Sequence, residues 1–153
     1  MNVLLICSVP DPKLHQAWIA TADVTAIREA VRGLAAAAKS IGRTLVVADH
    51  PAIVALTSAI LPPAQLVIID RKAIPVYRNA SFAILIGGCD NELEQARCAM
   101  RAEVGVYPIA STGSAALALW DELARERVFD ADESNRLRHD RVYGPLFERL
   151  LSS

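Results

Sequence analysis

Two short stretches of small and hydroxyl-bearing residues could bind an anion. Gly87 and Gly88 end the apolar run FAILIGG, and the stretch STGS spans residues 111–114. Glycine accepts positive φ and leaves backbone N–H groups uncovered, and N–H groups at the start of a helix favour phosphate or carboxylate. Ordinary strand-to-helix turns use the same residue types without binding anything. Taken singly, each stretch is compatible with either interpretation.

Carboxylate and imidazole side chains lie close to these or to similar segments. Glu92 and Glu94 follow the two glycines, where they either complement a helix dipole or, if one points into a cleft, hold ribose hydroxyls or act in cleavage of a glycosidic bond. Asp49 and His50 follow another apolar run and could form an acid/base pair. Alternatively, Asp49 caps a helix that begins at Pro51. The sequence leaves both choices open.

Several kinds of chemistry are disfavoured by the composition and motifs. The three histidines are far apart in sequence and lack a ligand pattern, so we expect no metal site and no cofactor. The three cysteines form no C-x-x-C pair, which indicates reduced thiols. No nucleophile elbow, P-loop or GxGxxG follows the first apolar run. These absences argue against the common hydrolases, NTPases and dinucleotide dehydrogenases.

The elements that must position these residues alternate between strands and helices. Apolar runs predict strands at residues 3–7, 44–48, 65–70, 82–88 and 105–111. Helical spacing and start signals predict helices at residues 23–40, 51–61, 91–103, 112–127 and 139–151. Residues 71–77 are interpreted as an edge strand that carries a proline, and residues 128–138 as a loop. Asp23 or Thr25 is expected to cap the first helix, and Ser111 or Thr112 the helix of residues 112–127.

This alternation predicts the fold class. Apolar strands separated by helices indicate a Rossmann-like α/β fold, a three-layer α/β/α sandwich with a mainly parallel sheet of about five strands. The chain has 153 residues, of which 53% are hydrophobic, so we expect one domain over residues 1–153. In such sheets ligands bind outside the carboxyl ends of the strands. The candidate residues above all lie at or just after the ends of predicted strands.

Charge and hydropathy limit the partners. The chain has 16 basic and 17 acidic residues without a basic cluster, which argues against nucleic acid as the main partner. No apolar run approaches the roughly 20 residues of a membrane span, and the N-terminus lacks the basic start of a signal peptide. We therefore expect a cytoplasmic protein that does not interact with membranes.

Four segments together resemble a known superfamily. SVPDP follows the first strand, DHPAI the second, IGGCDNELE the fourth and YPIASTGSAA the fifth. This order is similar to the SLOG superfamily, the Rossmann-like group that contains the LOG-type phosphoribohydrolases and the DprA proteins. It most resembles the SLOG domains of bacterial conflict systems that sense nucleotide-derived signals. The resemblance extends over nearly the whole chain.

The resemblance implies a nucleotide-like or ADP-ribose-like ligand at the strand ends. The residues implied to contact it are Ser8, His50, Gly87, Gly88, Ser111, Thr112, Gly113 and Ser114. In LOG-type enzymes the pattern PGGxGTxxE ends in a catalytic glutamate, and Glu94 falls at that position here. However, no proline precedes Gly87, and CDN replaces the segment with the second glycine and the threonine. The enzymatic signature is therefore degraded.

Three functions remain as hypotheses. The first is a sensor domain that binds a nucleotide-like small molecule and passes its occupancy to an effector protein. The second is a LOG-like hydrolase or transferase of nucleoside-phosphate N-glycosides, with Glu94 as the catalytic residue. The third is an assembly scaffold without a ligand. By analogy with the family, a homodimer is expected.

Overall fold

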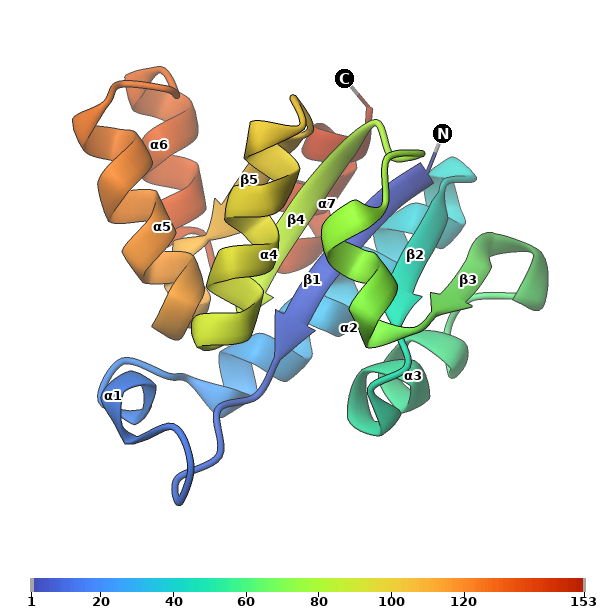
Figure 1. Ribbon diagram of the computed structural model, residues 1–153. Helices are drawn as coiled ribbons and strands as arrows, with labels where there is room; N and C mark the ends of the chain where they lie inside the picture. The colour runs from blue at the N-terminus through green and yellow to red at the C-terminus, as the bar shows by residue number, and fades with distance from the viewer. Residues whose placement is uncertain (1, 153) are drawn as a thin grey trace.

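A parallel β-sheet organises the molecule. The computed structural model describes residues 2–152, so the two ends of the predicted domain, residues 1 and 153, lie outside the described residues. Within residues 2–152, five parallel strands form one sheet in the order β3-β2-β1-β4-β5 (Figure 1). The strands are β1 (Asn2–Ser8), β2 (Thr44–Ala48), β3 (Leu66–Ile69), β4 (Phe82–Gly87) and β5 (Gly105–Ile109). The predicted Rossmann-like α/β fold is confirmed.

Helices connect and follow these strands. The α-helices are α1 (Gln16–Ile19), α2 (Val24–Ile41), α3 (Pro51–Ser58), α4 (Asp90–Arg101), α5 (Ser114–Arg125), α6 (Ala131–His139) and α7 (Tyr143–Leu151). Short 3₁₀ helices are η1 (Pro63–Gln65), η2 (Arg71–Val76) and η3 (Ala110–Thr112). No helix among residues 2–152 combines the length and the apolar character needed to cross a membrane.

Two hydrophobic cores lie on opposite faces of the sheet. Alternate strand residues such as Leu5 and Val47 pack with α2, α3 and α7 on one face. Their neighbours Ile6 and Val46 pack with α4, α5 and η2 on the other. Figure 1 shows these helices in layers before and behind the strands. The central strands are therefore apolar throughout, as expected of a parallel sheet that is covered on both faces.

The predicted start of the first long helix is confirmed. The Asp23 side chain accepts a hydrogen bond from the Ala26 N–H at 2.9 Å, which satisfies a backbone donor that has no partner within α2. Gly42 ends the helix in the left-handed conformation with φ 79°, where glycine has no steric penalty. Both ends of α2 are thus determined by residues that can be recognised in the sequence.

Two segments differ from their predicted structure. Residues 71–77 hold η2 rather than an edge strand, because the Asp70 side chain accepts the Lys72 N–H at 2.8 Å and begins a helical turn. Residues 128–138 contain most of α6 rather than a loop. Asp130 caps this helix by accepting the Glu133 N–H at 2.8 Å. α6 buries few apolar residues, so its sequence lacks the periodicity that reveals the other helices.

The order of the strands creates a switch point beside β1. From β1 the chain adds β2 and β3 on one side and then crosses to add β4 and β5 on the other. Ser8 at the end of β1 pairs with Gly87 at the end of β4. Loops that leave these two strand ends diverge, and ligands in open α/β sheets bind in the crevice between them. We therefore expect a ligand site at the carboxyl ends of β1 and β4.

Candidate ligand-binding site

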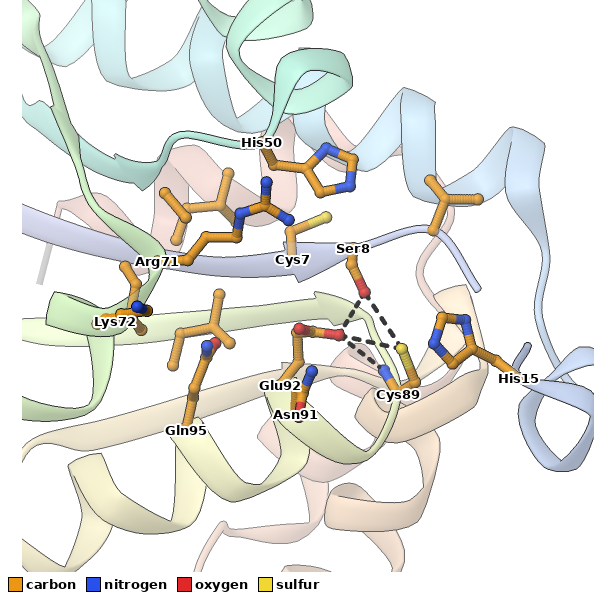
Figure 2. A pocket seen from close by; sticks show the side chains of 15 residues that line it. Cys7, Ser8, His15, His50, Arg71, Lys72, Cys89, Asn91, Glu92 and Gln95 are labelled. Carbon is orange, nitrogen blue, oxygen red and sulfur yellow. Dashed lines mark hydrogen bonds between the residues drawn. The ribbon is translucent and has the colours of Figure 1, made fainter. Parts of the chain in front are cut away.

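A cavity of about 340 Å³ opens at the carboxyl end of the sheet, beside β1 (Figure 2). Its walls come from the ends of β1 and β2, from η2 and from the first turns of α4. Polar side chains that line it include Ser8, His15, His50, Arg71, Lys72, Asn91, Glu92 and Gln95. Leu5, Ile6 and Ile74 contribute apolar surface. Cavities of ligand-binding sites combine apolar walls and a few polar groups in this way.

Glu92 is held in the cavity by three hydrogen bonds to one carboxylate oxygen. Its Oε1 accepts from the Ser8 hydroxyl, from the Cys89 N–H at 3.1 Å and from the Cys89 thiol at 3.2 Å. The bond from the Cys89 N–H is half of a capping box, since Glu92 is the third residue of α4. Gly88 makes room for it, because a Cβ there would lie 2.7 Å from the Glu92 Cβ. The carboxylate is therefore positioned by local structure before any ligand binds.

Cys89 acts in this cluster as a neutral thiol. Burial raises its pKa to about 11; the hydrogen bond with Ser8 opposes this rise, and the Glu92 carboxylate adds to it. At neutral pH the thiol is protonated and donates to Glu92. Because a thiolate is the reactive form of cysteine, this geometry does not support Cys89 as a nucleophile.

The opposite wall carries basic side chains. Arg71 and Lys72 lie on η2, and His50 is the residue before α3. Asp49, whose role the sequence left open, accepts from the Arg71 Nε at 3.3 Å instead of capping α3. Both partners of this ion pair are exposed, so it holds Arg71 only weakly. His50 Nδ1 is buried and has no hydrogen-bond partner among residues 2–152.

The structure brings two of the predicted ligand-binding residues, Ser8 and His50, into the cavity wall. Gly87 and Gly88 form the backbone turn beneath it, with φ values of 57° and 88°. The Gly88 N–H donates to the Ser8 carbonyl at 2.9 Å, and the Gly87 N–H to Thr112 Oγ1 at 2.9 Å. The two glycines therefore shape the site, but their amides are already used within the protein.

The turn of residues 111–114 does not line this cavity. The Ser114 N–H donates to Thr21 Oγ1 at 3.0 Å, and the Ser111 hydroxyl is hydrogen-bonded to the Tyr143 hydroxyl at 3.0 Å. All but the glycine carry side chains that are buried. The N-cap of α5 is Gly113 without a side-chain hydrogen bond, so the predicted capping by Ser111 or Thr112 is wrong. Thr21, in the chain ahead of α2, takes up the Ser114 amide, and the Gly113 amide donates to the Ala110 carbonyl within the turn.

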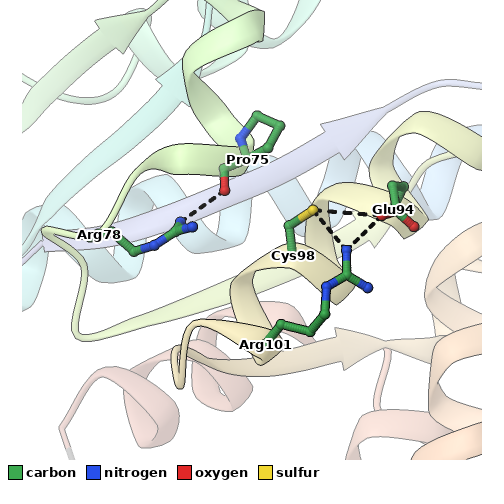
Figure 3. Close-up of polar contacts among 5 residues, drawn as sticks. All are labelled: Pro75, Arg78, Glu94, Cys98 and Arg101. Carbon is green, nitrogen blue, oxygen red and sulfur yellow. Dashed lines mark hydrogen bonds and ion pairs between the residues drawn. The ribbon is translucent and has the colours of Figure 1, made fainter.

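Glu94 also lies outside the cavity. Its carboxylate accepts from Arg101 at 2.7 Å on an exposed face of α4, beside Cys98 (Figure 3). The hydrogen bond and charge of Arg101 lower the pKa of Glu94. At 3.6 residues per turn, positions 92 and 94 point about 200° apart, so one of the two can face the cavity. That residue is Glu92, and its spacing of three from the N-cap is the signal that distinguishes the two.

Arg71 and Lys72 are polar residues of this site that the sequence does not reveal. They follow the predicted third strand, and the interpretation of residues 71–77 as an edge strand gives them no relation to the site. Their place depends on η2, which packs on the same face of the sheet as α4 and brings both side chains to the cavity (Figure 2). No local motif marks this turn as part of a ligand site.

Comparisons with known proteins give no family for this arrangement. No protein-family model matches the chain, and no curated protein matches it significantly. Within residues 2–152, no group of three or more potential ligand side chains is arranged to hold a metal ion. The chemistry of the site therefore has to be argued from its own residues.

Proposed function

We propose that the cavity binds a mononucleotide-like ligand, with its phosphate at Arg71 and Lys72 and its ribose at Glu92. The observation that carries this proposal is the division of the cavity into a basic wall on η2 and a fixed carboxylate on α4. A carboxylate accepts hydrogen bonds from vicinal hydroxyls, whereas guanidinium and ammonium groups bind phosphate. A ligand with a hydroxyl-rich part and an anionic part satisfies both walls.

The position of the cavity supports the same ligand class. It lies at the switch point beside β1, where nucleotides bind in open α/β sheets. Its volume of about 340 Å³ is near the small end of the range of small-molecule sites. This size favours a mononucleotide over the larger ADP-ribose. His50 Nδ1, which is buried and lacks a partner among residues 2–152, offers one further polar contact.

The proposed biological role is that of a sensor domain. Binding at the ends of β1 and β4 would change the environment of η2 and of the segment before α2, which lie at the molecular surface. A partner protein could read that change. This role agrees with what the SLOG resemblance implies, and the membership itself stays a prediction.

Calorimetric titration with AMP, adenosine and ribose 5-phosphate tests the ligand class. We expect AMP to bind more tightly than adenosine, because adenosine lacks the phosphate that Arg71 and Lys72 contact. The double variant R71A/K72A should weaken AMP binding at least about tenfold and leave adenosine unchanged. E92Q should weaken AMP and adenosine alike, because the ribose contact is common to both.

Two matched variants on α4 serve as controls. Glu94→Gln and Arg101→Ala alter an exposed ion pair on the same helix, away from the cavity. They should bind AMP like the wild type. The proposal would be contradicted if the wild type and R71A/K72A bound AMP equally well. It would also be contradicted, in favour of a scaffold, if the wild type bound none of the three compounds.

One observation favours an enzymatic alternative. Glu92, rather than Glu94, is the carboxylate that the cavity can offer to the anomeric carbon of a nucleotide. If the protein hydrolyses an N-glycosidic bond, free base should appear on incubation with a nucleoside monophosphate. E92Q should abolish this release, and E94Q should not change it. Binding without release in the wild type would support the sensor role instead.

A further inference from the structure

An uncharged segment forms one edge of the molecule. Residues 51–69 contain no Asp, Glu, Lys, Arg or His, although 22% of the chain is charged. The segment builds α3 and the edge strand β3. β3 lies at the end of the strand order, next to β2 alone (Figure 1). An edge of this composition lacks the charges that natural edge strands use against pairing with another chain.

β3 is also open on both faces. Val67 is 40% and Ile68 is 49% exposed, and successive residues of a strand point to opposite faces. Leu4, Leu5 and Val46 in the central strands are buried. β3 pairs with β2 in an unbroken register over Leu66–Ile69, so it has no bulge that would turn the edge away. Apolar surface on both faces of an edge strand indicates a surface that becomes covered.

The unpaired backbone groups of β3 can be identified. The Asp49 N–H donates to the Ile69 carbonyl at 2.9 Å, so Ile69 and Val67 direct their backbone groups toward β2. Leu66 and Ile68 consequently direct theirs outward. The Leu66 N–H bonds to the Pro63 carbonyl. Because β2 is the neighbour of β3 on one side only, the N–H and C=O of Ile68 face away from the sheet, and the edge offers one donor and one acceptor at its centre.

We propose that a second copy of this chain pairs with β3 in antiparallel orientation about a two-fold axis at Ile68. The N–H and C=O of each Ile68 then bond to those of the other copy, and Val67 lies opposite Ile69. The Leu66 carbonyl accepts the Asp70 N–H of the second copy. The two sheets become one sheet of ten strands, and a two-fold interface of this kind closes at a dimer.

The surroundings of β3 favour a second copy over an unrelated peptide strand. A strand of four residues is too small for a stable interface, which buries about 800 Å² on each partner. Ile68 shares its face of the sheet with α3, none of whose residues is charged. The outward residues Ala52 and Ala55 border α2 beside Arg28 and Arg32. Two-fold pairing at Ile68 brings the two α3 helices to the same junction. An added peptide strand would cover β3 but would give α3 no reason to be uncharged.

Measurement of the mass in solution tests the dimer. Sedimentation equilibrium should give a dimer for the wild type and a monomer for Ile68→Lys, because the substitution places two ammonium groups at the axis. Val142→Lys is a matched control, since Val142 is 71% exposed and lies before α7, away from β3. It should remain dimeric. Thermal unfolding should show that both variants are folded. A monomeric wild type, or a dimeric Ile68→Lys, would overturn the proposal.

Cross-linking tests the register. In an antiparallel hydrogen-bonded pair the Cα atoms lie about 5.5 Å apart, which is within the range of a disulfide. Ile68→Cys, in a Cys98→Ala background, should therefore oxidise to a covalent dimer. Val67→Cys should not, because Val67 opposes Ile69 and its counterpart is displaced along the strand. Equal cross-linking of both variants, or of neither, would exclude the axis at Ile68.

Discussion

The turns after β4 and after β5 share a backbone feature but have different environments. Each contains a glycine with positive φ, Gly88 at 88° and Gly113 at 75°, and each leads directly into a helix. The turn after β4 borders the cavity through Cys89 and Glu92. The turn after β5 is covered by Thr21. Neither turn keeps a free glycine amide, but the turn after β4 borders the cavity, whereas the turn after β5 is packed beneath Thr21.

The difference comes from a segment about 90 residues earlier in the chain. After β1 the chain forms α1 and then returns over the end of β5, where the Asp23 N–H donates to the Thr112 carbonyl at 3.3 Å. Thr21 takes up the Ser114 N–H, a donor that a phosphate would otherwise meet, and the Asp23 contact holds the covering segment in place. Local sequence marks both turns as candidate sites, and distant chain decides which of them borders a cavity.

The substitution with the largest expected effect is Gly113→Ala. A Cβ at this position would overlap the Thr21 carbonyl oxygen, and φ of 75° is unfavourable for alanine. The covering segment would have to move, so we expect the free energy of unfolding to fall by about 3 kcal/mol or more. Denaturation by urea, followed by circular dichroism, measures this loss.

Gly42→Ala is the control for Gly113→Ala. Gly42 has nearly the same φ, 79°, but a Cβ added there would meet no neighbouring atom within 4 Å. The free energy of unfolding of Gly42→Ala should therefore fall only because alanine disfavours this φ, by about 1 kcal/mol. Equal losses for the two variants would show that Thr21 does not press on the turn, and the distinction between an open and a covered turn would fail.

A smaller effect on the free energy of unfolding is expected for substitutions of Thr112, whose hydroxyl joins the two turns. The Thr112 hydroxyl accepts the Gly87 N–H at 2.9 Å and donates to the Ile109 carbonyl at 2.6 Å, and Thr112 is fully buried. Thr112→Val keeps the shape and leaves the Gly87 amide without a partner. The expected loss is about 2 kcal/mol in the free energy of unfolding. Thr112→Ser restores the hydroxyl and should recover most of it; a loss as large in Thr112→Ser would assign the effect to packing.

Most of the fold could be predicted because its signals are local. Continuous apolar runs revealed the strands, and Asp23 and Gly42 marked the ends of α2. α6 was not predicted because it is stabilised mainly by its N-cap and has few buried residues. η2 was not predicted because Pro75 and the apolar residues around it fit an edge strand equally well. Elements with little burial leave a weak pattern in the sequence.

The site could be predicted only in its position. The rule that ligands bind at the carboxyl ends of strands led to Ser8 and His50, which line the cavity. The choice between Glu92 and Glu94 required the phase of α4, which depends on where that helix begins. Arg71 and Lys72 required the path of η2. Distances between chain segments, rather than residue types, decide these points.

Asp23 provides the mildest test of the covered turn, because it anchors the covering segment to α2. The hydrogen bond from the Ala26 N–H and the nearby Arg141 guanidinium lower the pKa of Asp23 below its ordinary value of 3.8. The ionised carboxylate therefore stabilises the folded protein above about pH 4, and this contribution is lost as the pH falls through the lowered pKa. Asp23→Ala should cost about 1 kcal/mol at pH 7 and less at pH 3.

The matched variant Asp23→Asn separates the cap from the charge. Asparagine keeps an oxygen that can accept the Ala26 N–H but cannot ionise, so its stability relative to Asp23→Ala should not change between pH 7 and pH 3. Urea denaturation at the two pH values measures both differences. If the wild type keeps its full advantage over Asp23→Ala at pH 3, the Asp23 side chain acts through its hydrogen bond from the Ala26 N–H and not through loss of its charge in this pH range.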